Sequence, residues 1–410
     1  MLKGVEQVVP VSDFGAARLS LRVLALLIAG ALRVRHVEYL RGDPLVERLC
    51  GLGRLPSWHT LGRWLRGFDA GWVKALLEVN ERLVGDVIER SGLRRLTLDV
   101  DGSVVSTGLK VEGARRGFNP HRRKVPSYYP ITVYEANTGQ VLRVGNRAGN
   151  VHDGKASVSF LDELFDQLDA TLERRPVLEM RRDGAFFRED VIDVLDAEGV
   201  QYAIKVPFYR WLGLKERIPE CRYWARVDAT VECFEQWLPV PAWSRRMRVV
   251  VYRKRVHHRT AKNYQLDLFD PDNGYFEYSA VVTNKEVTGR TLWFFMCGRG
   301  THEKVYGELK GAFAFDCVPT QRYAANSAWQ VFSVIAFNLM RALQAGTSER
   351  RSMNRKRRTI QPFQTIQTLR YRFINRAGLL IKPNGRQILD VGNNPMVRKR
   401  FQAIENALSS

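Results

Sequence analysis

Three acidic residues stand where they could share one chemical task. Asp101 and Asp183 each end a stretch with the alternation of a β-strand, and Glu303 lies near the start of a predicted helix. Cleaving a phosphodiester bond requires an in-line nucleophile and relief of negative charge on the phosphate. Two Mg²⁺ ions roughly 3.5–4 Å apart supply both, and carboxylates are suitable ligands for them. We therefore predict that Asp101, Asp183 and Glu303 are catalytic and bind two Mg²⁺ ions, with Mn²⁺ as a substitute.

Basic residues flank the glutamate at helical spacing. Arg299 and Lys310 lie four residues before and seven residues after Glu303, so all three share one face if the helix extends back to Arg299. We expect Glu303 to bind metal and the two basic side chains to contact phosphates. An ion-paired surface helix would have the same pattern, so this segment alone does not decide between the two interpretations.

The segment from Arg299 to Lys310 resembles the R-(3)-E-(6)-K part of the signature of bacterial insertion-sequence DDE transposases, in the cut-and-paste group with a β insertion before the glutamate. Residues 100–103 (Val-Asp-Gly-Ser) and 181–186 (Arg-Arg-Asp-Gly-Ala-Phe) are similar to the segments around the two aspartates of that family. The family signature begins with a tyrosine three residues before the arginine, where this chain has Met296. Any phosphate contact from that hydroxyl is therefore absent or supplied elsewhere.

This resemblance implies a DNA transposase with an RNase H-like catalytic core. Such an enzyme cleaves at the inverted repeats of a mobile element and transfers the resulting 3′-hydroxyl ends to target DNA, as a homodimer assembled on double-stranded DNA. Relatives with this insertion pass through a DNA hairpin, and tryptophans of the insertion would either stack on a flipped base or, as is more usual for tryptophan, pack in the core. Two other functions stay open: a metal-dependent nuclease or resolvase on the same core, and a non-catalytic repressor derived from a transposase.

Some assignments have rivals in the sequence. Asp99 lies on the same face of its strand as Asp101, which we prefer because it ends the strand and matches the motif. Glu308 is a weaker rival to Glu303 because it breaks the spacing to the arginine and the lysine. Isolated histidines are more often structural or surface residues, and on this ground we leave four out of the site: His152, His257, His258 and His302.

The elements that must position these residues alternate between strands and helices. The order is strand, hairpin, helix, strand, helix, strand, over residues 96–101, 131–134 with 141–144, 156–172, 177–180, 189–197 and 201–206. This order predicts an α/β fold, an RNase H-like mixed sheet flanked by helices. Strand patterns at 247–256 and 276–283 indicate an insertion, after which helices resume near Thr301.

We divide the chain into five segments. They are a helical N-terminal DNA-binding or dimerisation region (1–92), the first part of the catalytic core (93–206), a β-rich insertion (207–290), the final part of the core carrying Glu303 (291–345), and a basic C-terminal region (346–410). In the first segment Ser57 is predicted to cap a helix that continues to Arg66. That helix is typical either of a helix–turn–helix unit on DNA or of a hairpin that only packs.

The charge and composition indicate the kind of partner. The 410 residues have a net charge of +21, which favours a polyanion such as nucleic acid. The most apolar stretch, residues 19–32, is too short to span a membrane, and the five scattered cysteines suggest the reducing cytoplasm. For a DNA-binding protein we expect a nucleoid-associated location there. Further basic residues are expected to contact the DNA backbone: Arg115, Arg116, Arg122, Arg123, Lys124, Arg253, Lys254, Arg255, Arg355, Lys356, Arg357 and Arg358.

Overall fold

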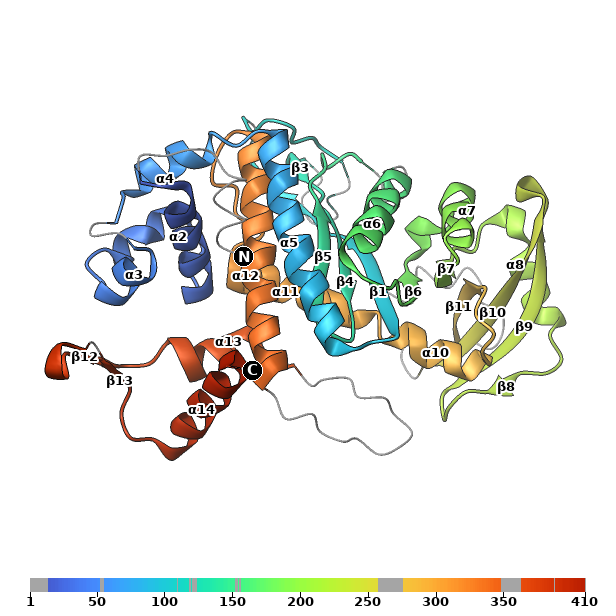
Figure 1. The fold of residues 1–410 in the computed structure, drawn as a ribbon. Helices are drawn as coiled ribbons and strands as arrows, with labels where there is room; N and C mark the ends of the chain where they lie inside the picture. Colours follow the sequence, from blue (N-terminus) through green and yellow to red (C-terminus); the bar gives the residue numbers. More distant parts are fainter. Residues whose placement is uncertain are drawn as a thin grey trace.

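A large mixed sheet forms the centre of the computed structural model (Figure 1), which describes residues 14–51, 55–108, 110–117, 119, 124–151, 154, 156–256, 276–347, 363–386 and 388–409. Over these residues the sheet has nine strands in the order β5-β4-β1-β6-β7-β11-β10-β9-β8. The first five in this order are β5 (Gln140–Gly145), β4 (Ile131–Glu135), β1 (Arg95–Gly102), β6 (Val177–Arg182) and β7 (Gln201–Val206). β4 is antiparallel to β5 on one side and to β1 on the other, whereas β1, β6 and β7 run parallel to one another. The predicted α/β, RNase H-like mixed sheet is confirmed.

Alternation along β1 assigns different chemistry to the two faces of the sheet. Leu96, Leu98 and Val100 are buried in an apolar core on one face. The helices over that core are the C-terminal half of α5 (Ala70–Ser91), α6 (Ser157–Thr171) and α7 (Glu189–Ala197). Thr97, Asp99 and Asp101 point to the opposite face, because successive side chains of a strand alternate. Every acidic residue of β1 therefore faces away from the apolar core.

The opposite face is covered by helices from the second half of the chain. These are α11 (Gly300–Phe313) and α12 (Tyr323–Thr347), which share a second apolar core with Tyr134, Val141 and Val144 of the sheet. Figure 1 shows α12 running beside α5 across the middle of the molecule. The chain thus returns to its first strands to complete the core.

The insertion continues the central sheet. It contributes β8 (Ala225–Arg226), β9 (Val231–Val240), β10 (Arg245–Arg255) and β11 (Phe276–Thr283). β11 pairs antiparallel with β7, with Ala280 opposite Val206, so backbone hydrogen bonds join the insertion to the core. The described residues of the insertion also form the α-helices α8 (Leu214–Glu220) and, at the end of the insertion, α10 (Gly289–Cys297). Helices after the insertion therefore begin at Gly289, earlier in the sequence than the predicted position near Thr301.

The N-terminal helices pack on the core. They are α2 (Ala16–Ala29), the 3₁₀ segment η1 (Val34–Leu40), α3 (Pro44–Leu49) and α4 (Trp58–Leu65). Ser57 caps α4, as predicted, by accepting a hydrogen bond from the backbone N–H of Thr60 at 3.3 Å. The apolar face of α4 contacts α12, where Trp64 lies 6.1 Å from Phe332 between ring centroids. α4 is thus a packed helix whose opposite face exposes Arg63 and Arg66.

The described C-terminal part contains more structure than its basic composition suggested. After α12 come α13 (Ile366–Leu369), the π-helical segment η6 (Arg370–Ile374), the hairpin strands β12 (Leu379–Ile381) and β13 (Ile388–Asp390), and α14 (Pro395–Ser409). Figure 1 shows this hairpin projecting from the body of the molecule. Among the described residues, no helix has the length and apolar character needed to cross a membrane.

Candidate active site

The register of two parallel strands brings the aspartates to one level. Asp99 of β1 is paired with Arg181 of β6. Continuing this register by two residues sets Asp101 opposite Asp183, the first residue after β6. Neighbouring strands lie roughly 4.8 Å apart, so the two aspartates stand side by side at the carboxyl ends of their strands. Asp183 also caps the short 3₁₀ turn η2 (Gly184–Phe186), accepting a hydrogen bond from the Gly184 N–H at 2.8 Å.

An arginine at the start of α11 links the first strand to the third acidic residue. Nη1 of Arg299 lies 3.5 Å from Oδ2 of Asp101, and Nη2 lies 3.9 Å from Oε1 of Glu303. Arg299 has helical backbone angles and immediately precedes α11, so the first turn extends back to it. The Glu303 side chain is 70% exposed, whereas Arg299 is only 14% exposed. The structure thus places Asp101 and Glu303 on two sides of one guanidinium group.

The three carboxylates are suited to a hard divalent cation. All supply oxygen, none is fully buried, and a positive group already lies between two of them. Among the described residues, however, no three His, Cys, Asp or Glu side chains are close enough to hold one ion as they stand. Bringing Glu303 onto an ion shared with Asp101 requires the Arg299 guanidinium to leave the space between them.

Asp99, the rival of Asp101, is taken up by an internal ion pair. Its oxygens accept hydrogen bonds from Nε and Nη2 of Arg181, each at 2.6 Å. Burial raises the pKa of Asp99 to about 6, against the opposing influence of Arg181. Nη1 of Arg181 also donates to the carbonyl of Phe295 at 3.0 Å. Because its side chain is 1% exposed and both oxygens are bonded, Asp99 is a poor metal ligand compared with Asp101.

Lys310 and Glu308 leave α11 in different directions. Nζ of Lys310 donates to the carbonyl of Val104 at 2.8 Å, close to the end of β1, and burial lowers the pKa of this lysine. Glu308 forms an ion pair with Arg341 of α12 and accepts from the N–H of Ile366 at 3.1 Å. Glu308 therefore ties α11 to its helical neighbours, while Lys310 remains on the side of the aspartates.

A buried polar cluster, which sequence reasoning missed, lies beneath the first turns of α11. Nε2 of His302 is 2.9 Å from Oγ1 of Thr132, and that hydroxyl donates to Tyr306 at 2.8 Å. The Tyr306 hydroxyl donates in turn to the backbone carbonyl of Asp101 at 2.7 Å. Burial, with the nearby positive charges of Arg299 and Arg181, lowers the pKa of His302 to about 3, so its ring is neutral.

The signal for this cluster was weak in the sequence. His302 and Tyr306 are four residues apart and so share a face of α11, and Thr132 is on a strand whose partner carries Asp101. Neither pattern distinguishes a polar cluster from ordinary helix packing.

The predicted DNA-binding residues occupy varied surroundings. Arg115, Arg116 and Lys124 are exposed beside β3 (Ser127–Tyr128), with Arg115 bridged to Ser127 through the backbone. Arg253 is enclosed instead: it pairs with Glu232 at 2.7 Å and stacks against two aromatic rings, Trp224 at 4.3 Å and Phe276 at 4.8 Å. Its neighbours Lys254 and Arg255 are exposed. Six predicted residues lie outside the described residues: Arg122, Arg123, Arg355, Lys356, Arg357 and Arg358.

An exposed group of aromatic rings lies near Asp183. Tyr209 and Trp211 follow β7 and are 47% and 50% exposed. Their rings are nearly parallel, at an interplanar angle of 12° and a centroid distance of 5.9 Å. Trp211 also stacks on Phe187, which is four residues beyond Asp183 in the sequence. Trp243 belongs to the same ring cluster, with centroid distances of 4.8 Å to Phe187 and 5.8 Å to Trp211, but only Trp211 of these two tryptophans is among the exposed large hydrophobic residues.

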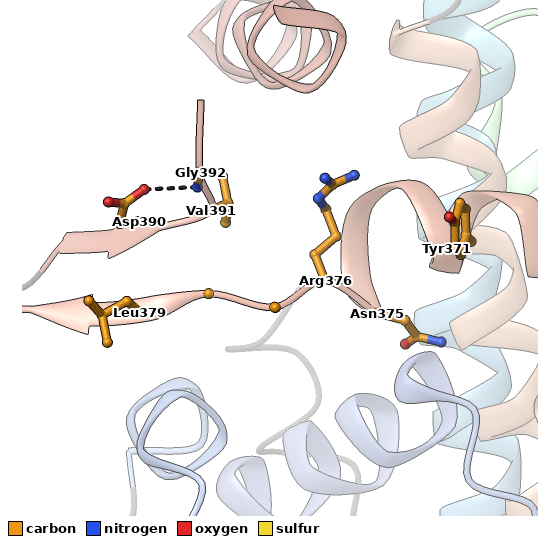
Figure 2. Close-up of a pocket in the computed structure, with 9 residues that line it drawn as sticks. Tyr371, Asn375, Arg376, Leu379, Asp390, Val391 and Gly392 are labelled. Atoms are coloured by element: carbon orange, nitrogen blue, oxygen red, sulfur yellow. Dashed lines mark hydrogen bonds between the residues drawn. The ribbon is translucent and has the colours of Figure 1, made fainter. Parts of the chain in front are cut away.

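A cavity of about 640 Å³ lies elsewhere, at the base of the C-terminal hairpin. Figure 2 shows Tyr371 and Asn375 on one side of it and Leu379, Asp390 and Val391 on the other. The carboxylate of Asp390 accepts a hydrogen bond from the Gly392 N–H at 2.8 Å and serves the local turn. None of Asp101, Asp183 and Glu303 lines this cavity, so it is separate from the candidate active site.

The fold places the chain among proteins with an RNase H-like mixed sheet. The sequence profile of a particular family, described as "Transposase DDE domain group 1", matches residues 17–410. The chain belongs to this family of DDE transposases. The bacterial insertion-sequence origin that the resemblance also implied stays a prediction.

Two solved transposase structures are among those that match the chain, both at low similarity. The cryo-EM structure of a piggyBac transposase synaptic complex with hairpin DNA has a TM-score of 0.46 and 9% identity, covering 100% of this chain and 79% of that one. The Mos1 transposase paired-end complex with the left transposon end has a TM-score of 0.20 and 12% identity, covering 45% of this chain and 57% of that one. No curated protein matches the chain. The family assignment rests on the sequence profile.

Proposed function

We propose that this protein is a DNA transposase that cleaves at the inverted-repeat ends of a mobile element and joins the 3′-hydroxyl ends to target DNA. The observation that carries the proposal is the arrangement of Asp101, Asp183 and Glu303 in a member of the DDE transposase family. Aspartates at the ends of two adjacent parallel strands face a helix that carries a glutamate and two basic residues. A binding protein has no need for acidic groups where phosphates must approach.

In this proposal each residue of the site has a distinct task. Asp101, Asp183 and Glu303 hold two Mg²⁺ ions, or Mn²⁺ in their place, which supply charge relief and nucleophile activation when bound. Arg299 balances the negative charge of Asp101 and Glu303 before metal enters and then contacts the scissile phosphate. Lys310 holds the segment after β1 through the Val104 carbonyl and adds positive charge near the DNA.

The basic surface binds the DNA backbone, and the aromatic rings near Asp183 contact unpaired bases. Arg115, Arg116 and Lys124 are exposed and free to meet phosphates, whereas Arg253 acts through its packing between two aromatic rings. Tyr209 and Trp211 present ring faces on which a base displaced from the duplex can stack. Two such chains assemble on the two DNA ends as a homodimer in the cytoplasm, associated with the nucleoid.

A cleavage and strand-transfer assay on DNA carrying the ends of the element tests this function. The wild type would be compared, with Mg²⁺ or Mn²⁺, with Asp101→Asn, Asp183→Asn and Glu303→Gln. The matched control is Asp166→Asn, which neutralises an exposed carboxylate on α6. We expect metal-dependent cutting and joined products from the wild type and the control. The three site variants should bind DNA but lose at least ~100-fold in activity, since each lacks a metal ligand.

Other outcomes identify the alternatives. Cutting without joining would identify a nuclease or resolvase on the same core. Salt-sensitive DNA binding without chemistry in the wild type would identify a repressor, and full activity in the site variants would show that the acidic residues are wrongly assigned.

A further inference from the structure

The hydrogen bonds beneath α11 run in one direction. The Asp101 carbonyl can only accept, so the single hydroxyl proton of Tyr306 is directed to it, at 2.7 Å. Tyr306 therefore accepts from Thr132, at 2.8 Å, which uses the only hydroxyl proton of that threonine. Thr132 must then accept from Nε2–H of His302, at 2.9 Å. The chain of donors starts on the helix, crosses β4 and ends on the backbone of Asp101.

These bonds are held in a dry, closely packed setting. His302 is 1% exposed, Tyr306 is 6% exposed and Thr132 is fully buried. The imidazole ring lies between two tyrosine rings, with centroid distances of 5.6 Å to Tyr134 and 4.9 Å to Tyr306. Buried hydrogen bonds of this kind are costly to break, so this series of hydrogen bonds defines the position of α11 on the sheet.

These hydrogen bonds connect the two parts of the candidate site, which come from distant parts of the sequence. His302 directly precedes Glu303, and Tyr306 lies one helical turn later, while the last acceptor belongs to Asp101 itself. Arg299 links the two acidic side chains directly, at 3.5 Å from Asp101 and 3.9 Å from Glu303. Metal sites need their ligands held within roughly 0.5 Å of the productive geometry, which these long contacts alone do not achieve.

We propose that Thr132, Tyr306 and His302 are positioning residues that fix the height and rotation of α11 on β1, so that Glu303 and Asp101 bind the same pair of metal ions. This inference rests on the proposed function, because it takes Asp101 and Glu303 to be metal ligands. The three side chains touch neither metal nor DNA and act only through the helix and the strand that they join.

Mn²⁺ binding to the full chain tests this role without relying on activity. Thr132→Val keeps the shape of the side chain and removes the hydroxyl, and Tyr306→Phe keeps the ring between its neighbours. We expect both variants to bind Mn²⁺ roughly tenfold more weakly in a calorimetric titration, because outer-shell partners of metal ligands contribute about this much. Thr132→Ser retains a hydroxyl at this position and should therefore bind Mn²⁺ with the affinity of the wild type.

Tyr252→Phe is the matched control. The Tyr252 hydroxyl also donates to a backbone carbonyl, that of Gly289 at 2.8 Å, and its side chain is 1% exposed, but it lies in the insertion. Tyr252→Phe and Tyr306→Phe should lower the melting temperature by similar amounts, while only Tyr306→Phe weakens Mn²⁺ binding.

Each result decides between the two proposals. If Asp183→Asn loses Mn²⁺ binding but Thr132→Val and Tyr306→Phe bind Mn²⁺ as tightly as the wild type, the positioning role is overturned and the proposed function stands. Equal loss of affinity in Tyr252→Phe would overturn it as well, because a general loss of stability would then explain the effect. A wild type whose Mn²⁺ binding equals that of Asp183→Asn would overturn the proposed function, and this inference with it.

Discussion

Two arginines divide the acidic residues of the site between them. Arg181 holds Asp99 with two hydrogen bonds of 2.6 Å in a closed, buried pair. Arg299 contacts Asp101 and Glu303 at longer distances, near the surface. A buried bidentate pair is costly to separate, whereas a longer and more exposed contact costs far less. Arg181 therefore belongs to the framework, and under the proposed function Arg299 is the group that would yield its place to a metal ion.

Gly298 gives Arg181 its space. A Cβ atom at position 298 would overlap Nη1 of Arg181, whose guanidinium cannot retreat without breaking its bonds to Asp99 and Phe295. We expect Gly298→Ala to lower the free energy of unfolding by about 1–3 kcal/mol, the usual cost of overpacking. It should also reduce DNA cleavage, because Arg299 is the next residue and Glu303 follows in the first turns of the same helix. Urea denaturation and the cleavage assay measure the two effects.

Gly300→Ala is the control for this prediction. A Cβ at position 300 meets nothing within 4 Å, and this glycine is also next to Arg299. Equal destabilisation by the two substitutions would contradict the role assigned to Gly298.

At the level of single residues, the sequence predicts what is local. The spacing of Arg299 and Glu303 on a helix and the position of Asp101 at a strand end are visible in the printed chain. Thr132 and Tyr306 are 174 residues apart, and their contact depends on how α11 sits across the sheet. The sequence also favours Asp101 over Asp99, and the structure adds a physical reason that the sequence does not show, because Arg181 bonds to both carboxylate oxygens of Asp99.

Among the elements, the edge strand β5 shows how side chains can complete a sheet. The N–H of Val141 donates to Oδ1 of Asn338 on α12, at 2.8 Å, and Nδ2 of Asn338 donates back to the Val141 carbonyl, also at 2.8 Å. Asn80 on α5 donates to the carbonyls of Val141 and Leu142, at 3.2 and 2.9 Å. A carboxamide carries a donor and an acceptor together, so it pairs with the exposed edge as a neighbouring strand would. The two helices thereby cover an edge that would otherwise be open to pairing with other chains.

We expect Asn338→Leu to destabilise the protein, because it removes the side chain of α12 that bonds to the edge of β5. Leucine fills a similar volume but leaves the Val141 N–H and the Asn80 side chain without their partner in a buried place. The free energy of unfolding should fall by about 2–3 kcal/mol, the cost of unsatisfied buried polar groups. Chemical denaturation measures it, with Asn137→Leu as a control in the nearby hairpin turn, where the residue is only half-buried. A loss no larger than in this control would contradict the edge-covering role.

The success of prediction also varied among the elements. α7 (Glu189–Ala197) and β7 matched their predicted bounds because their apolar periodicities are clear. α10 was missed because its apolar residues, from Leu292 to Met296, form an unbroken run with no helical period. Thr288 caps that helix by accepting from the Thr291 N–H at 3.3 Å, a local signal that was overlooked.

For the whole molecule, a buried ionic cluster fastens the insertion to the core. Lys285, which follows β11, forms an ion pair with Glu179 of β6, and Arg95 of β1 bonds to the same carboxylate at 2.5 Å. Burial alone would raise the pKa of Glu179, but the hydrogen bonds and charges of Lys285 and Arg95 outweigh it and lower the pKa below the ordinary 4.5. The carboxylate is thus charged in the folded protein at neutral pH, where it joins β6 to the start of β1 and to the segment after β11.

This cluster predicts a pH-dependent contribution to stability. Because the folded state lowers the pKa of Glu179, the stabilisation is complete above about pH 4.5 and is lost as the pH falls through the folded value. Glu179→Gln should reduce the free energy of unfolding by about 3 kcal/mol at pH 7, since it leaves Lys285 buried without its carboxylate. The difference from the wild type should shrink as the pH falls below about 4.5. Urea denaturation across this range measures it.

An exposed ion pair is the control for the cluster. Asp190→Asn removes the partner of Arg188, and the two side chains are 45% and 41% exposed. It should cost less than about 1 kcal/mol at pH 7. A pH-independent difference between Glu179→Gln and the wild type would mean that the charge of Glu179 is not what fastens the insertion.

The return of the chain to its first strands also has a consequence during synthesis. Asp101 and its contact Arg299 are separated by 198 residues, which a ribosome adds in roughly 10–40 s at ~5–20 residues per second. The site cannot assemble until α11 has emerged, and the edge of β5 is covered by α5 but lacks the bonds from α12 until that helix follows. Under the proposed function, a nascent or prematurely terminated chain that ends before α11 can carry part of the proposed DNA-binding surface and both aspartates, yet cannot cut DNA.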